Sequence, residues 1–287
     1  MHTVLGSPAK SVTIGPDQPF CIIGERINPT GRKKFQEQLR AGDMSAIEED
    51  VRAQVDCGAM VLDVNMGVPL TDEAELLAKA VTLIQSLTDL PLCIDSSVVE
   101  ALEAGLAAYE GKALVNSVTA EDERMELILP LVKKYNAAII ALPNDEHEIP
   151  EDPKRRVELV HKIMHVATTK YGIAPEDIVI DPLAMPVGAD AMHASRTMDA
   201  IYMIQQEVGV NMTLGASNVS FGMPDRHTLN AVFLPMAMRA GLTSAIMDAR
   251  TPQVVSAVKA ADLMLGNDAW GANWIQQHRA KQAAANA

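Results

Sequence analysis

Residues 60–95 read MVLDVNMGVPLTDEAELLAKAVTLIQSLTDLPLCID and contain one complete strand–helix–strand unit. The segment has a short apolar run near each end, Met60–Val64 and Leu92–Ile94. Short, continuous apolar runs are typical of strands that are buried on both faces, as in a parallel sheet. Between them, Asp72–Leu87 carries apolar residues at helical spacing. The stretch therefore predicts a parallel βαβ unit.

The same alternation continues through most of the chain. Further strands are expected at Phe20–Gly24, Ala113–Val115, Ala138–Leu142, Ile178–Ile180, Met212–Leu214 and Ala245–Met247. Further helices are expected at Ile47–Cys57, Val98–Tyr109, Glu123–Tyr135, Lys154–Tyr171, Arg196–Val208, Leu229–Ala240 and Pro252–Leu265. Eight strands and eight helices in strict alternation predict an α/β fold of the (β/α)8 TIM-barrel class. An open doubly wound sheet is the second possibility, but the first strand lacks the G-x-G-x-x-G turn of its dinucleotide-binding members.

Length and composition agree with one domain of this kind. The chain has 287 residues, of which 48% are hydrophobic and 21% charged, and barrels of this class have about 250 residues. We expect residues 20–267 to form the barrel. Residues 1–19 are expected to be an N-terminal extension and residues 268–287 a C-terminal helical tail.

The charge balance and the apolar segments exclude several classes of partner. The formal net charge is −13, whereas nucleic-acid binding requires clustered Lys and Arg. The two short basic runs, Arg32–Lys34 and Lys154–Arg156, are expected to be solvated. For Arg32–Lys34, contact with a folate glutamate tail or an acidic partner is the other possibility. No apolar segment suits a secretion signal or a membrane span, so we expect a cytoplasmic protein that contacts neither membrane nor nucleic acid.

Metal binding is not expected from this sequence. Cys21, Cys57 and Cys93 form no C-x-x-C pair, which also suits a reducing compartment. His161 and His165 are four residues apart on a predicted outer helix, a spacing that can bind zinc, but no third ligand is evident.

Polar side chains follow every predicted strand at its carboxyl end, where enzymes of this fold carry their active sites. They are Glu25–Asn28, Asp63, Asn65, Asp95–Ser97, Asn116, Ser117, Asn144, Asp181, Ser217, Asn218 and Asp248. Some of them, such as Asp248 and Ser97, could instead cap the next helix. Carboxylates and amides suit a flat heterocycle with several N–H groups, because a carboxylate can accept two N–H bonds from a guanidine-like edge. Pterin presents such an edge.

Six motifs, in order, resemble the folate-binding barrel of cobalamin-dependent methionine synthase and the methyltetrahydrofolate:corrinoid methyltransferases of the same family. The resemblance extends from residue 20 to about residue 265. The motifs are GERINPTG (24–31), LDVN (62–65), IDSS (94–97), VNSV (115–118), DP (181–182) and SNVSF (217–221).

The resemblance implies roles for individual residues. Asp95, Asn116 and Asp181 would hold the pterin ring, and Asn218 would contact N5, the methyl-bearing nitrogen, as the catalytic residue. The residues expected to bind pterin or folate are therefore Asp63, Asn65, Asp95, Asn116, Asp181, Asn218 and Arg226.

The resemblance also implies an activity. The protein would be a methyltransferase of one-carbon metabolism that moves the N5-methyl group between methyltetrahydrofolate and the cobalt of a corrinoid, in either direction. The chain lacks the Asp-x-His-x-x-Gly loop that holds cobalamin in relatives. A separate corrinoid protein would therefore supply the cobalamin, and a homodimer is expected.

Two other functions stay open from the sequence. One is a pterin enzyme similar to dihydropteroate synthase, although residues 28–34 do not match the Asn-x-x-x-x-Ser-Phe-Ser loop of those enzymes. The other is a folate-binding module without catalytic activity.

Overall fold

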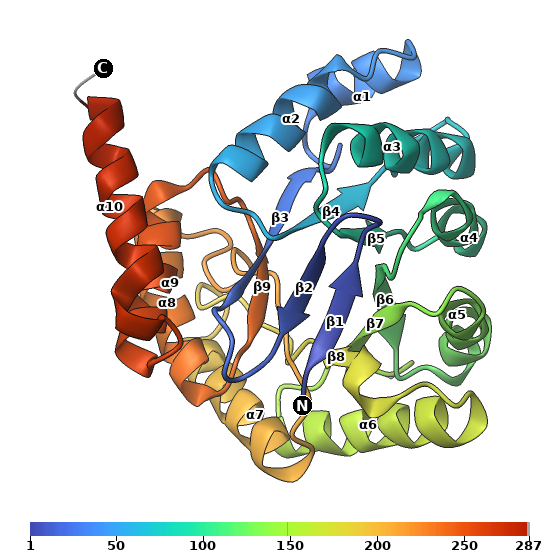
Figure 1. Ribbon diagram of the computed structural model, residues 1–287. Coiled ribbons are helices and arrows are strands. Elements are labelled where there is room, and N and C mark those ends of the chain that lie inside the picture. Colours follow the sequence, from blue (N-terminus) through green and yellow to red (C-terminus); the bar gives the residue numbers. More distant parts are fainter. Residues whose placement is uncertain (148, 286–287) are drawn as a thin grey trace.

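The computed structural model describes residues 1–147 and 149–285, and a curled parallel sheet lies at its centre (Figure 1). The strand order in this sheet is β8-β7-β6-β5-β4-β3-β9, and all neighbouring strands are parallel. The strands are β3 (Cys21–Ile27), β4 (Val61–Asn65), β5 (Leu92–Asp95), β6 (Leu114–Thr119), β7 (Ala138–Leu142), β8 (Ile178–Ile180) and β9 (Ser244–Met247).

Residues 211–216 close this sheet into a barrel. They form no continuous strand, but single parallel bridges join Met212 to Ile180 of β8 and Gly215 to Ile246 of β9. The segment predicted as a strand at Met212–Leu214 therefore lies in the expected place, between β8 and β9, but it is joined to them by isolated bridges. The fold is the predicted (β/α)8 barrel.

Helices cover the outside of the barrel (Figure 1). All eight predicted helices are present, with ends that differ by a few residues, and α1 is additional. The helices are α1 (Lys33–Arg40), α2 (Ser45–Asp56), α3 (Glu73–Leu87), α4 (Val99–Ala108), α5 (Asp122–Lys134), α6 (Pro153–His165), α7 (His193–Glu207), α8 (Arg226–Ala240) and α9 (Pro252–Leu265). A π-helical turn, Val166–Lys170, extends α6, and short 3-10 turns occupy Pro175–Asp177 and Ala269–Gly271.

Helix α3 illustrates how the sequence produces these elements. The Asp72 side chain accepts a hydrogen bond of 3.0 Å from the Glu75 N–H and so caps the helix start. Helical spacing then places four apolar side chains on one face, and all of them are fully buried: Leu77, Ala80, Val81 and Ile84.

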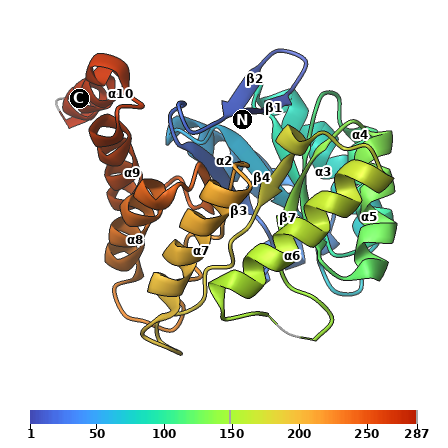
Figure 2. The ribbon, with the colours of Figure 1, turned by 90° about the horizontal axis from the view of Figure 1, so that it is seen from below.

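Residues 1–19 contain a β-hairpin that lies across the amino-terminal end of the barrel, at the top of Figure 2. It consists of β1 (Thr3–Gly6) and β2 (Ser11–Ile14), which pair antiparallel. Leu5 and Ile14 are fully buried in the hairpin. They pack against the side chains that fill the barrel: Cys21, Ile23, Val61, Cys93, Leu114, Ala138, Ile140 and Val179. The hairpin therefore closes one end of the barrel, and the opposite end carries the loops that follow the strands.

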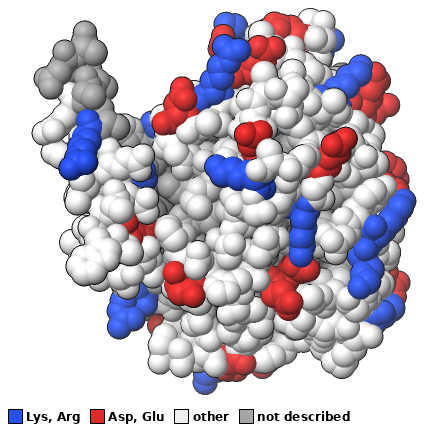
Figure 3. Space-filling view, in the orientation of Figure 1, with Lys and Arg blue, Asp and Glu red and all other residues white. Residues whose placement is uncertain are grey.

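The last described residues form α10 (Ala272–Ala285), which stands beside α9 (Figure 1). A cavity of about 720 Å³ lies between α10 and the barrel, and Phe20, Ile22, Met60 and Val258 are among its lining residues. On the amino-terminal side of the molecule, positive and negative side chains are interspersed rather than gathered into one patch (Figure 3). No helix among residues 1–147 and 149–285 is long and apolar enough to cross a membrane.

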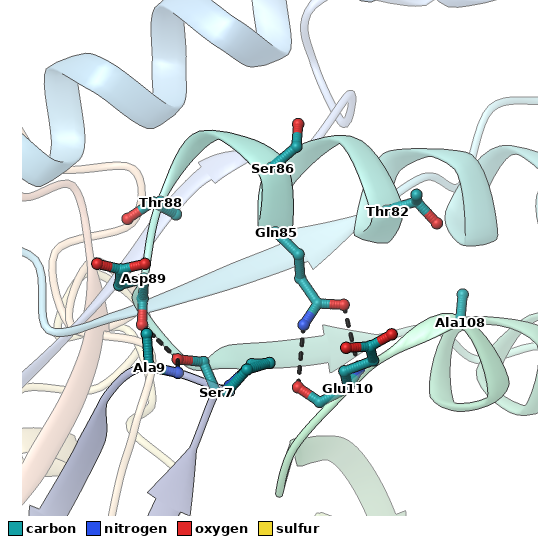
Figure 4. Close-up of a pocket in the computed structure, with 10 residues that line it drawn as sticks. Ser7, Ala9, Thr82, Gln85, Ser86, Thr88, Asp89, Ala108 and Glu110 are labelled. Carbon is teal, nitrogen blue, oxygen red and sulfur yellow. Dashed lines mark hydrogen bonds between the residues drawn. The ribbon is translucent and has the colours of Figure 1, made fainter.

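A smaller cavity, of about 300 Å³, lies where the hairpin turn meets α3 and the end of α4 (Figure 4). Its polar groups bond to one another. The Ser7 hydroxyl donates to the Asp89 carbonyl at 2.6 Å, and the Gln85 amide exchanges two hydrogen bonds with the backbone of Glu110. This cavity joins the hairpin to the barrel and lies at the end away from the predicted site.

Candidate active site at the carboxyl ends of the strands

Four of the predicted site residues form one group at the ends of β4, β5 and β6, which we call the amide–carboxylate cluster: Asp63, Asn65, Asp95 and Asn116. Register explains why they meet, because Asn65 pairs with Asp95 and Asp95 pairs with Asn116 across the parallel strands. The Asn65 side-chain amide donates to Asp95 Oδ2 at 3.0 Å, and the Asn116 amide donates to Asp63 Oδ1 at 3.3 Å.

Of the two carboxyl groups in this cluster, Asp63 is buried and Asp95 is partly buried. Burial raises the pKa of Asp63 well above its usual value, and the neighbouring charge of Asp95 raises it further. Burial also raises the pKa of Asp95 from 3.8 to about 6; the hydrogen bond from Asn65 opposes this rise and the charge of Glu73 adds to it. Within the described residues, no Lys or Arg pairs with either group. Both are therefore suited to a ligand that brings N–H donors.

Asp181 follows β8 on another part of the rim. Its Oδ1 accepts a hydrogen bond of 2.8 Å from the Leu183 N–H. Burial raises its pKa from 3.8 to about 6, while the positive charge of Arg156 opposes the rise. Among the residues that the structure describes, Asp181 has no hydrogen bond or ion pair with the amide–carboxylate cluster.

Asn218 lies in the loop after the segment that closes the barrel, and it is the exposed member of the predicted set. Its backbone N–H donates to the Gly215 carbonyl at 3.1 Å. Its side chain packs over the same glycine, since a Cβ at Gly215 would lie 2.9 Å from Asn218 Nδ2. Arg226, which begins α8, donates to the Ser217 carbonyl at 2.7 Å and to the Ser220 hydroxyl at 3.2 Å. Arg226 thus fixes the loop that carries Asn218.

A cavity of about 570 Å³ opens between this loop and the ends of β3 and β9. This volume is within the usual range for small-molecule sites. Glu25 lines it, and burial, followed by the negative charge of Asp248, raises the Glu25 pKa from 4.5 to about 7. The lining residues include Glu25, Arg26, Ala216, Ser217, Met223, Arg226, Met247 and Asp248. Glu25 was absent from the predicted site residues, although its position after the first strand was the available signal.

The structure corrects the prediction that both basic runs are solvated. Arg156 is fully buried, and its guanidinium donates to the carbonyl oxygens of Pro150, Pro182 and Leu183 at 2.7–2.8 Å. These three bonds compensate for the burial of the charge and brace the loop after Asp181. Arg32 is also engaged, in an ion pair of 2.6 Å with the buried Asp50.

One group of possible metal ligands is present among the described residues, and it differs from the histidine pair considered from the sequence. Glu151, Asp190 and His193 bring ligand atoms within 4.8 Å of one another. Arg196 Nη1 donates to both carboxylates at 2.9 Å and so occupies the position between them where a cation would bind. His161 lies 3.7 Å from Glu207 instead.

Comparison with known proteins agrees with this architecture. Residues 24–248 match the family described as pterin binding enzymes. The chain is 32% identical over 255 residues to the methylcorrinoid:tetrahydrofolate methyltransferase of Eubacterium limosum, and the match covers 86% of this chain and 92% of that protein.

Solved structures of dihydropteroate synthases share the fold. The Yersinia pestis enzyme with a pterin–sulfa conjugate gives a TM-score of 0.67 at 15% identity, over 92% of this chain and 98% of that one. The Xanthomonas albilineans enzyme with 4-aminobenzoic acid gives 0.68 at 18% identity, over 91% and 98%. The family match and the 32% identical relative confirm the resemblance inferred from the motifs, and the solved structures agree with it in fold. The chain belongs to the pterin-binding enzymes and, among them, to the methyltetrahydrofolate:corrinoid methyltransferase family.

Proposed function

We propose that this protein transfers a methyl group between N5 of tetrahydrofolate and a corrinoid carried by a separate protein. The observation that supports this most directly is the amide–carboxylate cluster, in a chain that is similar over most of its length to an enzyme named for this reaction. The name of the relative gives the direction from methylcorrinoid to tetrahydrofolate, and we propose the same direction here.

The polar groups on the rim fit a pterin edge. In the proposed complex, Asp95, Asn116 and Asp181 bind the ring. A carboxylate can accept two N–H bonds from the 2-amino group and N3–H, while an amide can donate and accept. Asp95 is partly buried and its pKa is raised, so N–H donors from the ligand would stabilise its ionised form. Ligand binding should therefore lower the Asp95 pKa.

The methyl-transfer step places a separate demand on the site. When tetrahydrofolate is methylated, the N5 lone pair forms the new N–C bond, the Co–C bond breaks with its electron pair remaining on cobalt, and N5 loses its proton. In the reverse direction N5 must gain a proton or a strong hydrogen bond, because a neutral amine is a poor leaving group. We assign the N5 contact to Asn218, whose amide can stabilise the protonated amine more than the neutral one.

Exposed apolar side chains at the barrel mouth offer positions at which the corrinoid protein can dock. Large apolar side chains are exposed on four loops that follow strands around the barrel mouth. They are Leu70, Ile149, Met192 and Phe221. We propose that the partner covers these side chains and so brings the corrinoid close to N5 of the bound folate.

The proposed function is tested by an absorption spectrum. Cob(I)alamin mixed with methyltetrahydrofolate and the protein should convert to methylcobalamin, and methylcobalamin with tetrahydrofolate should react in the opposite sense. Mixtures without protein are the control. Binding of methyltetrahydrofolate without conversion in either direction would contradict the proposal and support a binding module. Formation of dihydropteroate from 6-hydroxymethyldihydropterin pyrophosphate and p-aminobenzoate would support the synthase instead.

Asn218→Ala tests the proposed N5 contact. We expect the rate of methyl transfer to fall about 10²–10³-fold, as when one donor to a developing charge is lost, while the Kd for methyltetrahydrofolate changes only a few-fold. Stopped-flow spectra give the rate and titration calorimetry gives the Kd. Asn273→Ala, at an exposed position on α10, is the matched control. Equal losses in rate and affinity would contradict a transition-state role.

Asp95→Asn tests the proposed ring contact. The change removes the charge but keeps the shape, and a hydrogen bond to a charged group contributes about 1.5–3 kcal/mol. The Kd for methyltetrahydrofolate should therefore rise by roughly 10–100-fold, as measured by calorimetry. Asp199→Asn, an exposed carboxylate on α7, is the control. An unchanged Kd for Asp95→Asn would show that the ring is held elsewhere.

A further inference from the structure

Glu25 lies at a junction of three neighbouring strands on the barrel rim. It follows Gly24, which pairs with Leu62 of β4 on one side and with Met247 of β9 on the other. On the other side of β9 lies the segment that closes the barrel, residues 211–216. Its Gly215 forms a bridge with Ile246 of β9, and the segment leads into the loop that carries Asn218. Glu25 and this loop line the same cavity of about 570 Å³.

Charged groups from several elements interact with Glu25, and Asp225 and His227 line the same cavity. Its charge acts on Asp63 of the amide–carboxylate cluster, which follows β4. Arg26 on β3, Asp248 after β9 and Arg226 at the start of α8 act on Glu25 itself. Glu25 is thus positioned between the proposed pterin contacts and the loop that carries the proposed N5 contact.

The carboxyl groups that interact electrostatically with Glu25 or with Asp63 already have partners, whereas Asp225, which also lines the cavity, is exposed at the surface. Asp248 accepts two hydrogen bonds from the Arg250 guanidinium, at 2.9 and 3.0 Å, and Arg26 Nε lies 3.6 Å from it. Asp63 and Asp95 accept hydrogen bonds from the Asn116 and Asn65 amides. By contrast, no hydrogen bond or ion pair to the Glu25 carboxyl is found in the described part of the chain. Glu25 can therefore exchange a proton with a ligand or with water in the cavity.

We propose that Glu25 is the acid–base residue of the methyl transfer and accepts the N5 proton when tetrahydrofolate is methylated. This inference rests on the proposed function. As the N–C bond forms and the Co–C electron pair passes to cobalt, the proton leaves N5 for the Glu25 carboxylate, directly or through one water, and then passes to solvent. In the reverse direction the protonated carboxyl returns the proton to N5, and the neutral amine leaves.

The chemistry of Glu25 suits both directions. A group that donates and accepts protons is most effective when its pKa is close to the working pH. The Glu25 pKa, raised to about 7, provides both forms in neutral solution. Asn218, as a neutral amide, can bind the protonated amine but cannot supply or remove the proton.

The test is Glu25→Gln, which keeps the shape and removes proton exchange. In wild-type protein, the rate of tetrahydrofolate methylation from methylcobalamin should rise with pH through about 7, because the carboxylate is the active form. The rate of the reverse reaction should fall over the same range. In Glu25→Gln, both rates should fall about 10²–10⁴-fold and lose this pH dependence, while the Kd for tetrahydrofolate stays within about threefold.

Two further variants complete the experiment. Glu146→Gln, in the exposed loop after β7, should keep wild-type rates and pH profiles. Glu25→Asp keeps a titratable carboxyl, so it should restore a pH-dependent rate, below that of wild type because the reach is shorter; this variant carries the test if Glu25→Gln does not fold. Wild-type rates and pH profiles in Glu25→Gln, or a pH-independent Glu25→Asp, would overturn the role of Glu25. Failure of wild-type protein to react in either direction would instead overturn the proposed function.

Discussion

Asp181→Asn should make the free protein more stable while it weakens folate binding. Asp181 is partly buried at the end of β8, and its pKa rises from 3.8 to about 6 mainly because of desolvation. The Asn side chain keeps an oxygen that can accept the 2.8 Å hydrogen bond from the Leu183 N–H. The substitution therefore removes the cost of a buried charge and retains the local contact.

The size of the effect follows from the two pKa values. At low pH the carboxyl is protonated in both states and has no effect on stability. As the pH rises, the unfolded chain ionises first, so unfolding becomes more favourable until the folded carboxyl also ionises above pH 6. A rise from 3.8 to about 6 corresponds to a penalty of about 3 kcal/mol at pH 7.5. The penalty falls to about half of this value at pH 5.

Urea unfolding followed by circular dichroism measures this difference. At pH 7.5 we expect Asp181→Asn to raise the free energy of unfolding by about 2–3 kcal/mol and the Tm by about 5 °C. The gain should shrink at pH 5. Asp199→Asn, at an exposed position on α7, should change stability by less than about 0.5 kcal/mol. A variant that is less stable than wild type at pH 7.5, or a gain that grows toward pH 5, would refute the reasoning.

Two further substitutions test particular contacts. Gly215→Ala places a Cβ 2.9 Å from Asn218 Nδ2, so it should slow methyl transfer about as much as Asn218→Ala while the Tm changes little. Gly6→Ala is the control, because the atom nearest to its new Cβ would lie 3.8 Å away. An unaffected rate in Gly215→Ala would show that methyl transfer does not depend on the position of the Asn218 side chain. Leu5→Ala removes a fully buried side chain of the hairpin and should lower the free energy of unfolding by about 2–5 kcal/mol. In urea titrations Val4→Ala, at a half-exposed position, should lower the free energy of unfolding far less. Equal losses of stability in the two variants would show that the hairpin does not seal the barrel.

Much of the fold could be predicted because each strand is marked twice in the sequence, by an apolar run and by the polar residue that ends it. Parallel register then brings such residues to one level, as Asn65, Asp95 and Asn116 show. The hairpin is harder to predict, because its strands TVLG and SVTI are short and lack the continuous apolar run that marks most strands of the barrel. A period-2 pattern of that length is a weak signal until the barrel end that it covers is known.

Single side chains are less predictable than elements. Lys154, Arg155 and Arg156 form one basic run, yet only Arg156 is fully buried. Its partners are carbonyl groups of loops that come together through the barrel, so the run itself does not indicate which residue turns inward. Glu25 is similar: its environment includes Asp248 and Arg226, which lie about 200 residues further along the chain, so the run GERIN does not reveal that the structure describes no ion pair for Glu25.

The hairpin and the packed barrel interior leave one end of the barrel open to reactants. Side chains fill the barrel and the hairpin covers its amino-terminal end, so both reactants must approach from the carboxyl ends of the strands. If the corrinoid protein docks over the proposed folate site, folate has to bind first and can leave only after the partner has dissociated. The kinetics of the two-substrate reaction should therefore be ordered, with folate first in and last out.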